Sequence, residues 1–175
     1  EALIFTLNVI CDAGDEIIIP EPFYANYNGF ASSAGVNVVP VISEFTSQFE
    51  LPSLENITGK ITSKTKAILL CNPSNPTGYV YNEKEISTLC ELATKYDIFL
   101  IVDEVYREFI YGGNKHYSVL KYLGGSEHTV MIDSVSKRYS LCGARVGCIV
   151  SKNHMFIQNV LKFAHLRLSP PSIAL

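Results

Sequence analysis

The sequence lacks the features that identify membrane-spanning and exported proteins. None of its apolar runs approaches the roughly 18 residues that a membrane-spanning helix needs, and no signal peptide opens the chain. Repeats, low-complexity stretches and flexible linkers are also missing. We therefore expect no membrane partner, and one domain over residues 1–175 is the simplest organisation.

Strong charge and metal-ligand patterns are lacking too. The net charge is −3 and the sequence pI is near 5.8, which gives no reason to expect nucleic acid as a partner. The four histidines show no metal-ligand spacing, so we expect no metal, and no Walker-type phosphate loop is present. The five cysteines are odd in number and mostly sit in apolar runs, which is typical of reduced, buried thiols in a cytoplasmic protein.

Short apolar runs that alternate with longer helical patterns are what the sequence does contain. The expected strands cover residues 16–20, 36–42, 65–71, 98–106, 129–134 and 146–151, and the expected helices cover residues 1–14, 24–35, 83–97 and 154–166. Strands that are apolar on both faces and separated by helices predict an α/β fold. We expect three layers, α/β/α, around a mostly parallel central sheet.

Polar residues follow three of these strands directly. The segment NPSNPTG (72–78) follows one strand, Asp103 and Tyr106 end the next, and Ser134 and Lys137 follow the third. Ligands of such sheets bind at the carboxyl ends of the strands, so these residues are candidates for one site.

Each of these residues also has a plain structural interpretation. NPSNPTG is typical of a turn, and Asp103 could cap the segment that follows it. Lys137 could be solvated, and Arg145 could pair with a surface acid. Only the joint occurrence of the segments favours a functional site.

Taken together, NPSNPTG (72–78), VDEVY (102–106) and SVSKRYSLCGARVG (134–147) resemble the fold-type-I pyridoxal-phosphate aminotransferases of class I/II. The similarity runs from residue 1 to the segment RLSPPSIA (167–174). It implies the large pyridoxal-phosphate-binding domain of an enzyme that moves an amino group between an amino acid and a 2-oxo acid. The lysine segment looks most like that of bacterial aspartate aminotransferases, so aspartate is the favoured amino acid, with alanine and aromatic amino acids left open.

The resemblance also implies catalytic roles. Lys137 holds the cofactor aldehyde as a Schiff base and carries the substrate's alpha proton. Asp103 keeps the pyridine nitrogen protonated, so that the ring accepts electrons. Asn75 and Tyr106 match the family positions that donate hydrogen bonds to the phenolic oxygen of the ring.

The remaining cofactor contacts are assigned in the same way. Ser134 and Arg145 match the family's phosphate ligands, and Ser136 is a weaker candidate that could simply allow the lysine loop to turn. Tyr24 matches the residue that stacks on the ring. Gly143 and Gly147 are expected to allow tight turns around Arg145. The resemblance further predicts cis peptide bonds at residues 21–22 and 75–76.

Parts of the family's active site are expected to lie outside this sequence. The resemblance implies a phosphate-binding turn before residue 1, a smaller domain after residue 175, and a homodimer with active sites at its interface. We therefore expect a fragment that is cut at both ends. Two alternatives remain: a lyase or synthase of the same fold, and a cofactor-binding sensor domain without catalysis.

Overall fold

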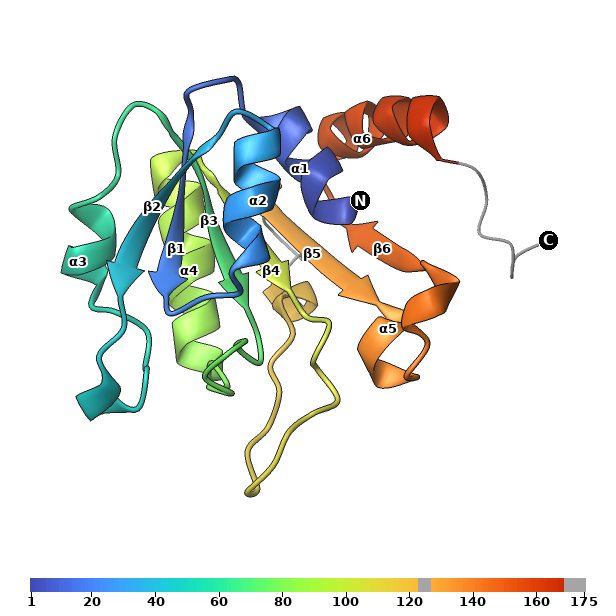
Figure 1. Ribbon diagram of the computed structural model, residues 1–175. Helices are drawn as coiled ribbons and strands as arrows, with labels where there is room; N and C mark the ends of the chain where they lie inside the picture. Colours follow the sequence, from blue (N-terminus) through green and yellow to red (C-terminus); the bar gives the residue numbers. More distant parts are fainter. Residues whose placement is uncertain (123–126, 169–175) are drawn as a thin grey trace.

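The computed structural model describes residues 1–122 and 127–168, so most of the segment RLSPPSIA lies outside the described residues. Its centre is a six-stranded sheet in the order β2-β1-β3-β4-β5-β6 (Figure 1). The first five strands run parallel, and β6 pairs with β5 in the antiparallel direction. The strands are β1 (Glu16–Glu21), β2 (Asn37–Ile42), β3 (Thr65–Cys71), β4 (Phe99–Asp103), β5 (Thr129–Ser134) and β6 (Gly147–Val150).

Helices cover both faces of the sheet, which confirms the predicted α/β/α layers. One core cluster joins the sheet to α1 (Ala2–Ile10), α2 (Asn26–Ser33) and α6 (His154–Arg167). The other joins its opposite face to α3 (Leu54–Thr58) and α4 (Glu83–Tyr96) (Figure 1). Within residues 1–122 and 127–168, no helix is long and apolar enough to cross a membrane.

Strong sequence signals place the central elements. In β3 only Lys66 is half-buried and the other residues are buried, because the strand lies between both core clusters. Helix α4 begins at a capping box, in which the Asn82 side chain accepts from the Glu85 amide and the Glu85 carboxylate accepts from the Asn82 amide. It ends at Asp97, whose φ of 54° is left-handed. Its apolar residues face the core, as the periodicity predicts.

Several predicted boundaries were wrong. The strand expected over residues 98–106 ends at Asp103, and the helix expected over residues 1–14 ends at Ile10. Helices α3 and α5 (Val135–Arg138) and three 3-10 helices, at Phe45–Ser47, Val119–Tyr122 and Cys142–Ala144, were not predicted. These elements have five residues or fewer, which is too short to show a hydrophobic period.

The cysteines do not all lie in the core. Cys71 and Cys90 are buried, as expected, and burial raises the pKa of the Cys71 thiol to about 12 and that of Cys90 to about 11. Cys142 and Cys148, in contrast, are exposed. Cys148 lies in an apolar run, but β6 is an edge strand and its side chains are only partly covered.

Candidate functional site

The carboxyl ends of β3, β4 and β5 lie side by side and carry most of the predicted site residues. Cys71 at the end of β3 is in register with Asp103 at the end of β4, and Asp103 is in register with Ile132 of β5. Asn75, Tyr106 and Lys137 follow these three ends in the chain. The predicted gathering of polar segments at one edge of the sheet is therefore present.

Asp103 is a buried carboxylate with two hydrogen-bond donors. Its residue is 9% exposed; the Val105 amide donates to Oδ1 at 3.2 Å, and the Tyr27 hydroxyl donates to Oδ2 at 2.9 Å. Burial raises the pKa of Asp103, although both donors act in the opposite direction. The site thus contains a carboxylate whose ionised form is destabilised by burial, which is typical of a functional carboxylate.

Tyr27 is the residue that the sequence reasoning missed. It lies in α2, is 1% exposed, and reaches Asp103 across 76 positions of sequence. Burial, followed by the Asp103 charge, raises the pKa of Tyr27 well above its usual value, so its hydroxyl remains a donor. The only available signal was its place three residues after Tyr24, one helical turn along the chain.

Lys137 lies on α5 and faces the ring of Tyr106. Its Nζ is 5.7 Å from the centroid of the Tyr106 ring, within the range of a cation–π contact. Tyr106 is half-buried and makes an edge-on contact with Phe109, at 6.0 Å between ring centroids. Lys137 itself is exposed. The structure therefore brings together, at an open surface, two predicted catalytic residues that follow separate strands.

The two predicted phosphate-binding serines are in contact. The Ser134 hydroxyl caps α5 by accepting from the Ser136 amide at 3.1 Å, and it donates to the Val146 carbonyl at 2.9 Å. The Ser134 and Ser136 hydroxyl oxygens are 2.7 Å apart. The contact with Val146 also brings the serines next to the segment that carries Arg145, since the Val135 amide donates to the same carbonyl.

Arg145, rather than the glycines beside it, adopts the unusual backbone conformation of this turn. Its φ is 55°, and its Nη1 donates to the Cys142 carbonyl at 2.9 Å. The expected role of Gly147 in a tight turn was wrong. A Cβ at Gly147 would lie 2.9 Å from the Asp133 carbonyl oxygen, so glycine is needed there for the close approach of β6 to β5. Gly143 has neither a positive φ nor a close neighbour.

Tyr24 and Asn75 lie at the edge of the same region. Tyr24 is 37% exposed, and its ring packs edge-on against Tyr27, with 5.5 Å between ring centroids. Asn75 lines a small pocket together with Tyr27 and Cys71. The peptide bonds at residues 21–22 and 75–76 are cis, as predicted, and a third cis bond at residues 72–73 was not.

Glu104, beside Asp103, has a structural role, because it holds neighbouring segments together through buried hydrogen bonds. It is fully buried, and its Oε1 accepts from the Val119 amide at 2.7 Å and the Ser118 hydroxyl at 3.0 Å. Its Oε2 lies 3.1 Å from Nε2 of His116. These contacts tie the segment after β4 to the 3-10 helix at Val119–Tyr122.

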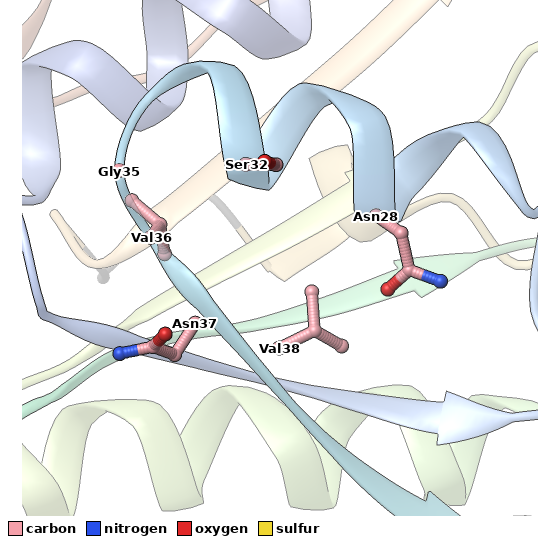
Figure 2. A pocket seen from close by; sticks show the side chains of 6 residues that line it. All are labelled: Asn28, Ser32, Gly35, Val36, Asn37 and Val38. Atoms are coloured by element: carbon pink, nitrogen blue, oxygen red, sulfur yellow. The ribbon is translucent and has the colours of Figure 1, made fainter.

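A separate surface pocket of about 410 Å³ lies between α2 and β2 (Figure 2). Its lining carries no charged side chain and none of the predicted site residues; it consists of Asn28, Ser32, Gly35, Val36, Asn37 and Val38. Among residues 1–122 and 127–168, no group of three or more His, Cys, Asp or Glu residues could hold a metal ion.

Comparisons with known proteins place this geometry among aminotransferases. A family model described as aminotransferase class I and II matches residues 1–174. Aspartate aminotransferase of Bacillus subtilis is 37% identical over 174 residues, which are 99% of this chain and 44% of that protein. Human kynurenine–oxoglutarate transaminase 3 is 37% identical over 163 residues, which are 88% of this chain and 36% of that protein.

Solved structures agree with these relatives. The crystal structure of aspartate aminotransferase from Thermotoga maritima superposes with a TM-score of 0.90 at 32% identity, over 99% of this chain and 46% of that one. The aromatic aminotransferase of Pyrococcus horikoshii gives a TM-score of 0.89 at 29% identity, over 97% and 45%. The chain therefore spans less than half the length of the proteins that it resembles.

Proposed function

The chain belongs to the aminotransferase class I and II family, and from this premise we propose that it is the cofactor-binding core of a pyridoxal-phosphate-dependent aminotransferase. The observation that carries the proposal is the edge where the buried Asp103 carboxylate, the Tyr106 ring and the Lys137 amine follow neighbouring strands. A carboxylate, an aromatic hydroxyl and an amine are the groups that a pyridine aldehyde cofactor needs.

The residues present fit this cofactor at both of its ends. The buried position of Asp103 favours a neighbouring cation. Burial raises its pKa because it makes the ionised carboxylate unfavourable, and a positive ring nitrogen would offset this cost of ionisation. At the other end, Arg145 has no carboxylate within 4.0 Å among residues 1–122 and 127–168, although its charge helps to lower the pKa of Glu1. The Arg145 guanidinium, on the segment that the Ser134 hydroxyl contacts, suits a phosphate group together with the two serine hydroxyls.

The cofactor, when bound, supplies an electron sink for the bond that breaks at the substrate's alpha carbon. Asp103 would hold the proton on the ring nitrogen, and Tyr27 would keep the Asp103 carboxylate ionised and oriented through its 2.9 Å hydrogen bond. The Lys137 amine can bond covalently to an aldehyde and, when free, can accept and return the alpha proton. The hydroxyl of Tyr106 and the amide of Asn75 would donate to the ring's phenolic oxygen.

The phosphate end would be held by groups that are already clustered. The hydroxyls of Ser134 and Ser136 satisfy each other at 2.7 Å, and both can turn toward an incoming anion. The Arg145 guanidinium would exchange its contact with the Cys142 carbonyl for two phosphate oxygens. Tyr24, whose ring is exposed beside Tyr27, would cover the face of the cofactor.

For the substrate, we favour aspartate as the amino-group donor and a 2-oxo acid as the acceptor. This choice rests on the Bacillus subtilis and Thermotoga maritima relatives, both of which are named aspartate aminotransferases. The homodimer that the family resemblance implies is part of the same proposal.

An assay of the protein that carries this chain tests the proposed reaction. With pyridoxal phosphate, aspartate and a 2-oxo acid acceptor, we expect a new 2-oxo acid from aspartate and no release of ammonia. The Lys137→Ala variant should show neither product, because it lacks the amine. Ammonia release without amino-group transfer would instead identify a lyase, and binding of the cofactor without any turnover of amino acids would favour a sensor domain.

A further inference from the structure

Four charged side chains link the segment that carries Tyr106 to the segment that carries Lys137. The Asp133 carboxylate lies at the centre: its Oδ2 is 2.5 Å from Nη2 of Arg138 and 3.8 Å from Nη1 of Arg107. Glu108 closes the ring on the solvent side, with its Oε1 at 3.5 Å from Nε of Arg138 and 3.8 Å from Nε of Arg107. We call these four residues the Asp133 cluster.

The position of the two arginines in the chain connects the cluster to the candidate site. Arg107 directly follows Tyr106, and Arg138 directly follows Lys137. Both guanidinium groups are bound by one carboxylate, so the two segments are held together immediately beside the contact between Lys137 and Tyr106. Beyond the paired ends of β4 and β5, these side-chain contacts join the two segments, because Arg107 lies in a turn after β4 and Arg138 ends the four-residue α5.

Asp133 is fixed more firmly than a surface acid. Its side chain is only 10% exposed, and its Oδ1 accepts from the Ser134 amide at 2.7 Å. Burial alone would lower the pKa of Arg138, but the charge and hydrogen bond of Asp133, together with smaller contributions from Tyr139 and Glu108, raise it. A carboxylate that is mostly shielded from water and bound on both oxygens keeps its geometry far better than an exposed ion pair.

We propose that Asp133 is a positioning residue for Lys137: it binds the guanidinium groups of Arg107 and Arg138, holds Lys137 against Tyr106, and neutralises the positive charge next to the Lys137 amine. This inference rests on the proposed function, in which Lys137 is the nucleophile. Without Asp133, the exposed Glu108 would be the one carboxylate within 4.0 Å of both arginines among residues 1–122 and 127–168. The local charge would rise by one, and protonation of the Lys137 amine would become less favourable.

Other ionisable groups also face this region, and they set the background for the test. They come from β4 and the turn after it, from α5 and the residue after it, from the segment before β6, from β6 and from the residue before α1. They are Asp103, Tyr106, Arg107, Glu108, Arg138, Tyr139, Cys142, Arg145, Cys148 and Glu1. Asp133 differs from these groups because it contacts both flanking arginines and is also mostly buried.

The reactivity of the Lys137 amine toward trace acetic anhydride provides a test that needs no cofactor. Acetylation of Lys137 is measured by peptide mass spectrometry between pH 6 and pH 10, with exposed Lys152 as the internal reference. In Asp133→Asn we expect about threefold faster labelling of Lys137 at pH 8 and a rate profile displaced to lower pH. A change of about one unit charge several ångströms away, in a water-like medium, is expected to change the fraction of unprotonated amine about threefold.

Charge and structure are separated by a cycle of variants. Arg138→Gln should slow the labelling of Lys137, because it removes a positive charge, and Asp133→Asn combined with Arg138→Gln should restore the wild-type profile. Glu83→Gln, which breaks the exposed ion pair between Glu83 and Lys121, is the matched control and should leave the profile unchanged. Circular dichroism confirms that each variant is folded.

The proposal is overturned if folded Asp133→Asn and Arg138→Gln both label Lys137 with the wild-type pH profile, since Asp133 would then act on stability alone. If Asp133→Asn does not fold, Arg138→Gln and the double variant still decide the question. Failure of the protein to bind pyridoxal phosphate would contradict the proposed function without affecting these labelling rates.

Discussion

Replacing Tyr27 by phenylalanine tests the buried link between Tyr27 and Asp103. The change removes one hydroxyl from a side chain that is 1% exposed and leaves the ring in place. The lost interaction is the 2.9 Å hydrogen bond to Asp103 Oδ2, and hydrogen bonds to charged groups contribute about 1.5–3 kcal/mol. Because Asp103 keeps the Val105 amide as its remaining donor, we expect the free energy of unfolding to fall by about 2 kcal/mol at pH 8.

The effect should depend on pH in a defined direction. Burial raises the pKa of Asp103 in the folded protein above the ordinary 3.8 that it has in the unfolded chain. The folded state therefore gains stability from binding this proton. The gain is fully present below pH 3.8 and is lost as the pH rises through the pKa of the folded state. Removing the Tyr27 donor raises that pKa further, so the variant loses more stability than the wild type at high pH. As pH falls and the Asp103 carboxyl takes up its proton, the cost should fall toward about 1 kcal/mol.

Urea unfolding followed by circular dichroism at pH 4 and pH 8 measures both values. Tyr24→Phe is the matched control, because Tyr24 is 37% exposed and its hydroxyl accepts from the exposed Asn26 side chain. This control should change stability by less than about 0.5 kcal/mol at either pH. Equal costs for the two variants at pH 8, or a cost for Tyr27→Phe that does not change with pH, would refute the reasoning.

Three further predictions concern stability. Asp103→Asn should reduce the pH dependence of the free energy of unfolding between pH 4 and pH 8, because it removes the buried carboxyl whose pKa is raised; an unchanged pH dependence in urea unfolding would argue against this. Gly147→Ala should destabilise the protein by about 1–3 kcal/mol in the same measurement, since its Cβ would meet the Asp133 carbonyl, and an unchanged midpoint would contradict the close approach. Asn82→Ala should lower the melting temperature through a loss of about 1 kcal/mol from the α4 cap, whereas an unchanged melting temperature would show that Glu85 alone caps the helix.

The sheet and its polar edge could be predicted because their signals are local. β3 was predicted over residues 65–71 and runs Thr65–Cys71, since a run of apolar residues bounded by turns identifies a buried strand. Asp103 was placed at the carboxyl end of its strand on the same grounds. The antiparallel direction of β6 was not predicted, because the pattern of apolar residues in an edge strand of four residues carries no information on direction.

The parts that were missed depend on contacts between distant segments. In the sequence, Tyr27 looks like one apolar position of a helix. Its hydroxyl reaches Asp103 because α2 packs on the sheet. In the same way, the sequence pattern indicates only that Asp133 lies near the end of a strand. Its two arginine partners come from the turn after β4 and from the end of α5. Such pairs cannot be found from spacing within one element.

The attachment site of the cofactor is the central claim, and one measurement tests it most directly. The chain is titrated with pyridoxal phosphate, the visible absorbance is recorded, and the product is reduced with borohydride and mapped by peptide mass spectrometry. The account predicts a new visible band and a reduced adduct on Lys137 alone, with the band lost in Lys137→Ala. Adducts scattered over many lysines, or a band that persists in Lys137→Ala, would contradict the assignment of Lys137 as the cofactor-binding amine.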